Sequence, residues 1–301
     1  MSSQIDQPHP GAAAPALACI LLTHRDPAHV HRLIDALDPF PVFLHCDRRT
    51  ADPVFEQMTA GLPDRVTVLP RIATPWAGWM AVEAEIAGYR AALAQSSATH
   101  IATLSGSDYP LVSTERIAAY LDDHDGRSIV GFDPLPRAPW GRDGGLARLR
   151  YRHRPWRQHM IRIPLPRRIP SDVAPAGGSV HKVLARHHAQ QLVDAFDSRP
   201  DLRAFWRHSW APDETFIPTI LNSPLFAPDW AESHAFSEDL WFIDWAGGGG
   251  KSPEWMRIDH LPKLTERAAA GSTLFARKFS SDRAPGLLDA IDAGPRSTAR
   301  A

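Results

Sequence analysis

The sequence has few cysteines, no long apolar run and almost no net charge. Both cysteines, Cys19 and Cys46, fall in segments predicted to be buried strands, so we exclude a disulfide scaffold and expect two reduced thiols. No stretch approaches the ~20 apolar residues that a membrane-spanning helix needs, and the start shows no basic-then-apolar signal pattern. With 33 basic and 34 acidic side chains, nothing points to nucleic acid as a partner. We expect a cytoplasmic globular protein.

The glycine and ligand patterns of common cofactor sites are missing as well. A dinucleotide-binding fold would need a glycine-rich turn after the first strand, and residues 23–27 (THRDP) contain no glycine. The four glycines at 247–250 are followed by Lys251, but they lack the spacing of a phosphate-binding P-loop. His187 and His188 are adjacent, so we expect their side chains to point to different sides of a helix and predict no zinc-type site.

The remaining composition favours one large domain. Hydrophobic residues make up 44% of the 301 residues, which is enough for a sizeable core. Residues 1–15 are small, polar and proline-containing, and they predict a disordered lead-in. We place a single domain at residues 16–292 and a tail at 293–301.

Short apolar runs alternate with helical stretches along most of the chain. Strands are predicted at residues 17–22, 42–45, 66–69, 100–104, 128–132 and 241–245, and helices near 30–37, 80–93, 180–196 and 261–270. This alternation predicts an α/β fold with an open, mostly parallel sheet. Ligands of such sheets bind at the carboxyl ends of the strands. The predicted strand ends carry Thr23, His24, Asp47, Ser105 and Asp108.

Residues 134–178 interrupt this order. They hold ten arginines, from Arg137 to Arg168, with several prolines and few periodic apolar positions. Loops of this length are usually functional or disordered. Two interpretations stay open: a solvated basic loop, or a surface that receives an acceptor. Peripheral contact with the inner face of a membrane fits the same arginines.

Pro212-Asp213-Glu214 is typical of the first turn of a helix. Proline suits the first helical position, and acidic side chains there face the positive end of the helix dipole. Local pattern alone therefore predicts that Asp213 and Glu214 cap and charge-match a helix.

Six motifs in a fixed order resemble one known family. The sequence is similar to the core-2/I-branching enzymes, which include branching β-1,6-N-acetylglucosaminyltransferases and peptide O-xylosyltransferases. The motifs are HCDR at 45–48, TPWAG at 74–78, LSGSDYPL at 104–111, PDE at 212–214, IDW at 243–245 and LFARKF at 274–279. Each motif is weak alone, but together they cover nearly the whole chain. The segment at 178–181 departs from the family pattern, which leaves the transferred sugar open.

The resemblance implies a GT-A-type glycosyltransferase that inverts the anomeric centre. A UDP-sugar would donate the sugar, N-acetylglucosamine ahead of xylose, to a hydroxyl of a glycan, a lipid-linked acceptor or a protein. Inversion needs one carboxylate to take the acceptor proton, and Glu214 matches the family's catalytic glutamate. The family works without metal, and residues 105–108 (SGSD) carry one carboxylate where many GT-A enzymes have two. No cofactor is therefore expected.

The other site residues follow from the same resemblance. Cationic Arg277, Lys278 and Lys251 would stabilise the diphosphate. Asp47, Thr23 and His24 would line the uridine site, and Ser107, Asp108 and Trp245 the donor or acceptor site; Trp76 and Trp79 are expected to pack. Two other functions stay open: a metal-dependent transferase that uses Asp108 and Asp47, and a catalytically silent glycan-binding module.

Overall fold

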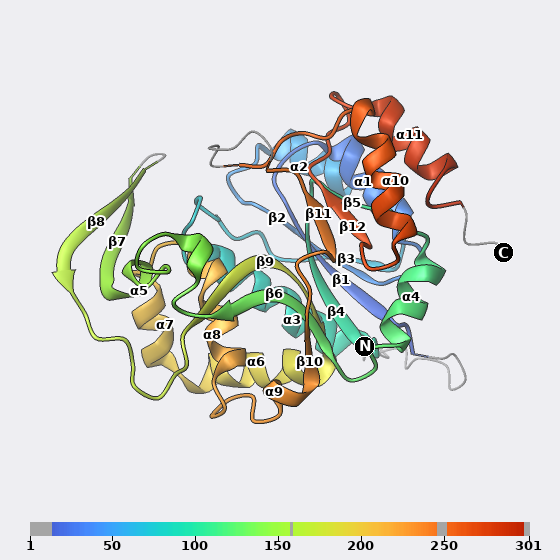
Figure 1. The fold of residues 1–301 in the computed structure, drawn as a ribbon. Coiled ribbons are helices and arrows are strands. Elements are labelled where there is room, and N and C mark those ends of the chain that lie inside the picture. Colours follow the sequence, from blue (N-terminus) through green and yellow to red (C-terminus); the bar gives the residue numbers. More distant parts are fainter. Residues whose placement is uncertain (1–13, 157–158, 246–251, 298–301) are drawn as a thin grey trace, which may run out of the picture.

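The computed structural model describes residues 14–156, 159–245 and 252–297, and its centre is a seven-stranded sheet (Figure 1). The strand order is β10-β6-β9-β4-β1-β2-β3, and only β9 runs antiparallel to its neighbours. This confirms the predicted α/β class with a mostly parallel sheet, an architecture consistent with the GT-A type. The strands are β1 (Leu17–Thr23), β2 (Val42–Cys46), β3 (Val66–Val68), β4 (His100–Ser105), β6 (Ser128–Pro134), β9 (Ala176–Ala185) and β10 (His234–Phe236).

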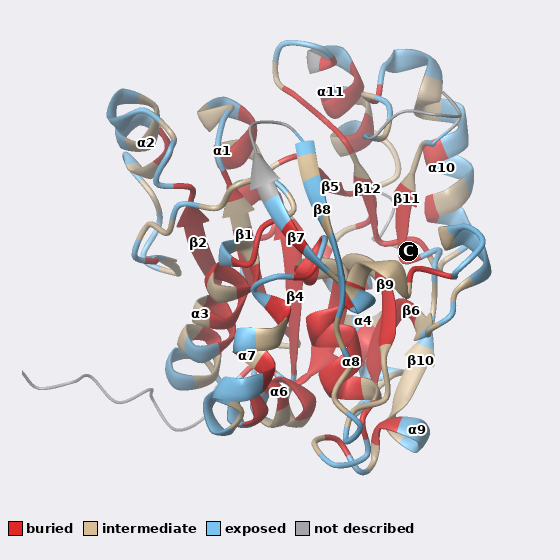
Figure 2. Cartoon of the chain, turned by 90° about the vertical axis from the view of Figure 1, so that its left-hand side faces the viewer, coloured by how far each residue is buried: buried red, intermediate tan, exposed pale blue. Residues whose placement is uncertain are grey.

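Helices cover both faces of the sheet, so its central strands are buried on both sides (Figure 2). In β1, Leu17, Cys19 and Leu21 enter one core, and Ala18 and Ile20 enter the other, because successive side chains point to opposite faces. The helices that pack on the first core include α1 (Pro27–Ala36), α4 (Thr114–Asp122), α10 (Leu261–Ala269) and α11 (Pro285–Ala293). Those that pack on the second include α3 (Met80–Gln95), α6 (Arg186–Ser198), α7 (Pro200–Trp206) and α8 (Phe216–Asn222).

A small second sheet joins three distant segments of the chain. β12 (Phe275–Arg277) pairs in parallel with β11 (Trp241–Ile243) and antiparallel with β5 (Asp108–Pro110). In this register Arg277 lies opposite Asp108. The sheet therefore places the LFARKF motif beside the end of β4.

The structure corrects two of the predicted segments. Residues 180–185 belong to β9, between β4 and β6, and the helix predicted from 180 begins only at Arg186. The segment 134–178 is not a long loop: it contains η1 (Ala138–Trp140), α5 (Ala147–Arg150) and a hairpin of β7 (Tyr151–Trp156) and β8 (His159–Pro166). The hairpin stands apart from the central sheet in Figure 1. The remaining short elements are α2 (Asp52–Thr59), η2 (Pro212–Glu214), α9 (Trp230–Ser233) and η3 (Ile258–His260).

The ends of the chain are only partly described. The predicted lead-in at 1–15 falls almost entirely outside the described residues. At the other end, Arg296 donates to the carbonyl of Ala36 at 2.8 Å, so the predicted tail packs against α1 up to that point. Cys19 and Cys46 are buried free thiols, as predicted. Among the helices of the described ranges, none has the length and apolarity to cross a membrane.

Candidate functional site

The carboxyl ends of three parallel strands meet at one edge of the sheet. Leu22 pairs with Ser105, and Thr23 pairs with Cys46, so β4, β1 and β2 end side by side. β9 begins at the same edge, because its antiparallel course sets Gly177 against Asp133 near the end of β6. The residues that follow these strands are therefore gathered as the sequence predicted.

A cavity at this edge has Glu214 in its wall. Its volume is about 530 Å³, and its lining comes from the loop after β3, the arginine-rich segment and the PDE motif: Trp76, Ala77, Arg148, His159, Met160, Trp210, Ala211, Asp213 and Glu214. Trp76 and Trp210 are 52% and 38% exposed. The prediction that Trp76 packs is therefore wrong, whereas Trp79 is buried against Phe216 as expected. The hairpin also contributes, through His159 and Met160 of β8.

The backbone around the cavities is locally strained. Three non-glycine residues of the described chain have positive φ: Asp26 (56°), Ala77 (53°) and Ala211 (46°). An alanine side chain makes no hydrogen bond that could offset the strain of a positive φ, and strained residues of this kind cluster at functional sites. Ala77 and Ala211 line the Glu214 cavity, and Asp26 lines a second cavity described below. This distribution supports a functional interpretation of both cavities.

The PDE motif forms a single 3-10 turn instead of the first turn of a longer helix. The turn covers Pro212–Glu214, and α8 begins only at Phe216. Neither Asp213 nor Glu214 makes a side-chain cap, so the predicted capping role is wrong. The turn packs against β9, where the Glu214 carbonyl lies close to Gly177.

The two adjacent carboxylates have different surroundings. The Glu214 side chain is 36% exposed to the cavity and pairs with the Arg148 guanidinium. Asp213 points inward, and its buried Oδ1 finds no hydrogen-bond partner among the described residues. Burial, reinforced by the neighbouring charge of Glu214, raises the pKa of Asp213 to about 7. Behind it lies a buried ion pair between Lys182 and Glu85, at 2.6 Å.

Arg148 is a site residue that sequence reasoning missed. Its guanidinium lies 3.8 Å from the ring centroid of Trp140 and 4.9 Å from that of Trp210, in addition to its contact with Glu214. Stacking between two rings fixes a guanidinium plane and leaves its edge free for a carboxylate. Nothing in the local sequence distinguishes Arg148 from the other nine arginines of its segment. Glu214 lies 66 positions later in the chain, and only the fold brings the two side chains together.

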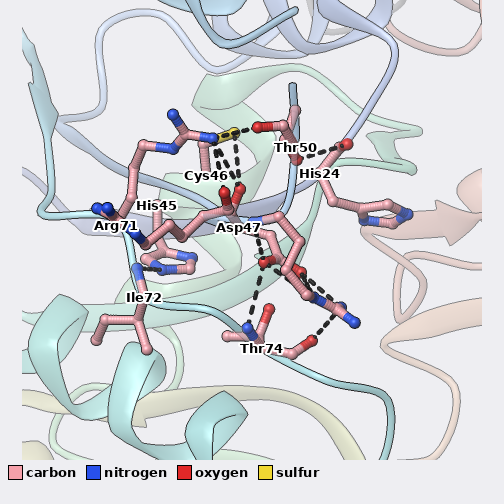
Figure 3. Close-up of polar contacts among 10 residues, drawn as sticks. His24, His45, Cys46, Asp47, Thr50, Arg71, Ile72 and Thr74 are labelled. Carbon is pink, nitrogen blue, oxygen red and sulfur yellow. Dashed lines mark hydrogen bonds and ion pairs between the residues drawn. The ribbon is translucent and has the colours of Figure 1, made fainter. Parts of the chain in front are cut away.

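Asp47 sits at the end of β2 and is enclosed by donors (Figure 3). Its oxygens accept from the Arg49 guanidinium at 2.7 Å, from the Arg49 amide at 2.9 Å and from the Thr74 amide at 3.2 Å. Burial would raise the pKa of Asp47, but these hydrogen bonds outweigh it and lower the pKa to about 2. Through Thr74, Asp47 anchors the loop that carries Trp76 to the Glu214 cavity.

The other two residues assigned to the uridine site differ in exposure. Thr23 is 3% exposed, and its hydroxyl donates to the carbonyl of His45 at 3.0 Å, so it is engaged within the sheet. His24 is exposed directly after β1. Of the pair, only His24 presents a side chain to a ligand at this edge.

Asp108 is fully buried and ordered by several partners. It accepts from the Ser105 hydroxyl at 2.7 Å and the Ser105 amide at 2.9 Å, and it lies 3.4 Å from His181 and 3.7 Å from Arg277. Burial opposes ionisation, but His181, Arg277 and Ser105 lower the pKa of Asp108 to about 2. Asp108 therefore orients Arg277, which also contacts His181 at 2.8 Å, and is itself closed to a sugar.

Lys278 belongs to a cluster of cations around Trp255. The Lys278 ammonium lies 4.4 Å from the Trp255 ring centroid, and the guanidinium groups of Arg25 and Arg283 lie at 4.8 and 5.0 Å. Burial, followed by the neighbouring arginines, lowers the pKa of Lys278. A cavity of about 320 Å³ opens here, lined by Arg25, Asp26, Ser107, Trp255, Phe279, Ser280, Ser281, Asp282 and Arg283. Such a cluster suits a multiply charged anion.

Ser107, Trp245 and Lys251 are the last of the predicted site residues. Ser107 is 8% exposed, accepts from the Phe279 amide through its carbonyl at 2.8 Å, and lines the second cavity. Trp245 is 58% exposed just beyond β11. Lys251 lies outside the described residues.

Comparison with known proteins gives a family match over most of the chain. The model of the "Core-2/I-Branching enzyme" family matches residues 29–266. None of the curated proteins matches the sequence. Among solved structures, one that matches is described as a glucose-1-phosphate thymidylyltransferase from Bacillus anthracis in complex with sucrose. It is 9% identical, with a TM-score of 0.35, over 74% of this chain and 86% of that chain.

Proposed function

The chain belongs to the Core-2/I-branching enzyme family, a family of glycosyltransferases, and from this premise we propose a specific reaction. The protein transfers one sugar, N-acetylglucosamine ahead of xylose, from a UDP-sugar to a hydroxyl of a glycan, a lipid-linked acceptor or a protein. Transfer inverts the anomeric centre and uses no metal. Glu214 takes the proton of the acceptor hydroxyl as that oxygen attacks the anomeric carbon and the bond to UDP breaks.

The observation that carries this proposal is the position of Glu214 in a cavity that two exposed tryptophans also line. The rings of Trp76 and Trp210 offer flat apolar faces to the C–H surface of a sugar. A cavity of about 530 Å³ falls in the range typical of small-molecule sites. Arg148 holds the Glu214 carboxylate in place, and a fixed base is what a single displacement needs. Since β8 supplies His159 and Met160, we assign the arginine-rich segment to the acceptor side.

The departing UDP needs positive charge at its diphosphate. Arg277 is the last residue of β12 and Lys278 follows it, and the Lys278 ammonium lies close to the Trp255 ring together with the guanidinium groups of Arg25 and Arg283. Fixed cations aimed at a developing negative charge lower the barrier to its departure.

The metal-dependent alternative fits this edge less well. It would use Asp47 and Asp108, but the oxygens of both carboxylates already accept from protein donors. A metal ion would have to displace these donors first. We therefore favour cationic side chains over a metal as the diphosphate partner.

The test is sugar transfer from a panel of UDP-sugars to a glycan array, with EDTA present. Glu214→Gln should lower kcat by about 10²- to 10⁴-fold, because a general base contributes that much. The matched control is Glu56→Gln, an exposed carboxylate on α2, which should leave the rate unchanged. Full activity of Glu214→Gln rules out the assigned base, and a strict need for Mn²⁺ rules out the metal-free reaction. UDP-sugar binding with no turnover on any acceptor would make the chain a glycan-binding module instead.

A further inference from the structure

Two histidines and an aspartate meet at the edge of the sheet opposite to the Glu214 cavity. His187 and His188 lie in the first turn of α6, which follows directly on β9. The end of β9 pairs with His100, the first residue of β4, so the cluster lies at the amino ends of the parallel strands. Asp229 precedes α9 and faces both histidines. No role proposed above uses this cluster.

The three side chains converge despite the adjacency of the histidines. The two ring centroids lie 4.0 Å apart. Nε2 of His187 is 3.0 Å from Oδ2 of Asp229, and Nε2 of His188 is 3.8 Å from Oδ1. One donor atom from each residue can be chosen so that all three lie within 4.8 Å of one another. The sequence-based expectation that the histidines point to different sides is therefore wrong.

These separations suit a first-row divalent cation. Zinc binds histidine nitrogen and carboxylate oxygen at about 2.0 to 2.2 Å in tetrahedral geometry, which sets ligand atoms roughly 3.3 Å apart. Small rotations of exposed side chains would bring the observed separations to that value. His187 and Asp229 are 40% and 43% exposed at their side chains, so an ion can reach the cluster from solvent.

The surrounding groups orient the ligands toward one point. Ser128 Oγ lies 2.7 Å from Nδ1 of His188, which leaves Nε2 to face Asp229. The Asp229 carboxylate accepts from the Gln191 amide at 3.1 Å and from the Ser233 hydroxyl at 3.2 Å. Outer hydrogen bonds of this kind fix the tautomer of a ligating histidine and the plane of a ligating carboxylate.

Two buried nitrogens in the cluster are unsatisfied, Nε2 of His187 and Nε2 of His188. His188 is 0% exposed, and its Nε2 has no hydrogen-bond partner among the described residues. Buried polar atoms nearly always find a partner, so this one calls for a ligand.

We propose that His187, His188 and Asp229 bind one zinc ion, with water completing the coordination. The ion would join the start of α6 to the segment before α9. Only the folded chain brings the ligands of these two segments together. Zinc therefore binds the folded state in preference to the unfolded one and stabilises it. Its role is structural, and it takes no part in sugar transfer.

The test uses the full chain, free of affinity tags and stripped of metal with a chelator. Zinc is titrated in competition with a chromophoric chelator, and thermal unfolding is followed with and without zinc. We expect one zinc ion per chain and a higher Tm with zinc. His187→Ala and Asp229→Asn should each weaken zinc binding by at least about 10-fold. The control is Asp194→Asn, on the same helix, which should bind zinc as the wild type does.

Cobalt provides a second measurement that does not depend on stability. Co²⁺ in this site should give visible d–d bands of a four-coordinate N/O site, and His187→Ala should abolish them. The proposal is overturned if the wild type takes up no zinc at 100 µM, or if both variants bind zinc as tightly as the wild type. No UDP-sugar enters these measurements, so either proposal can fail without the other.

Discussion

Replacing Asp213 with asparagine tests the environment behind the proposed base. The carboxylate is turned inward, its Oδ1 is buried without a partner, and its pKa is raised to about 7 by burial and by Glu214. Asparagine has nearly the same shape and cannot ionise. Asp213→Asn therefore removes the penalty of a buried charge and leaves the packing intact.

The sign and size of the effect follow from the raised pKa. Below pH 3.8 the carboxyl is protonated in both the folded and the unfolded chain, and it costs no stability. As pH rises from 3.8 to about 7, the unfolded chain releases the proton and the folded chain retains it, so stability is lost. Each pKa unit is worth about 1.36 kcal/mol, which gives a loss of roughly 4 kcal/mol above pH 7. Partial exposure reduces this, and we expect a loss of about 2 to 4 kcal/mol.

The assay is urea unfolding of the wild type and the variant at about pH 5 and pH 8.5. The free energy of unfolding of Asp213→Asn should exceed that of the wild type, and by more at pH 8.5 than at pH 5. Asp64→Asn, at an exposed position, is the control for a generic loss of one negative charge. An equal gain at both pH values, or a variant less stable than the wild type at pH 8.5, would refute the assignment of a raised pKa.

Three further substitutions test separate parts of the site. Gly177→Ala would set a Cβ 2.6 Å from the ring of Trp140, so the ring must move. The kcat/KM for transfer should fall about 10-fold or more, while the circular dichroism spectrum stays that of the wild type. Lys182→Met leaves the buried carboxylate of Glu85 without its cation, which should cost about 3 to 5 kcal/mol in urea unfolding; adding Glu85→Gln should recover part of it. Asp108 has its pKa lowered from 3.8 to about 2, so it stabilises the fold above pH 3.8, and this contribution is lost as pH falls toward 2. Asp108→Asn should therefore be about 2 kcal/mol less stable at pH 6, with the difference nearly gone at pH 2, as measured by urea unfolding at both pH values.

The strands that were predicted correctly are those whose pattern is local. β1, β2 and β4 are continuous apolar runs because helices cover both of their faces, and such runs stand out in the sequence. β9 was missed in part because Lys182 interrupts its apolar pattern. That lysine is 0% exposed and is paired with Glu85, 97 positions earlier, a contact that no local window contains.

The same limit applies to the candidate site. The sequence placed Glu214 there only through the order of six motifs, because its own neighbourhood predicts nothing more than a helix start. Arg148 lines the same cavity, although its segment was expected to be a loop. Trp76 lines it too, although its side chain was expected to pack in the interior. Convergence of this kind is set by the sheet edge and the hairpin, not by spacing along the chain.

The structure also gives a reason to assign the base to Glu214 and not to Asp213. The two residues are adjacent in one 3-10 turn, so their backbones are equally close to the cavity. The turn directs the Glu214 side chain outward, into the cavity that Trp76 and Trp210 also line and against a guanidinium fixed by stacking. It directs Asp213, whose Oδ1 is buried, toward the Lys182–Glu85 pair, where a charge is penalised. Exchanging the two residues should therefore abolish transfer, even though both carboxylates are retained.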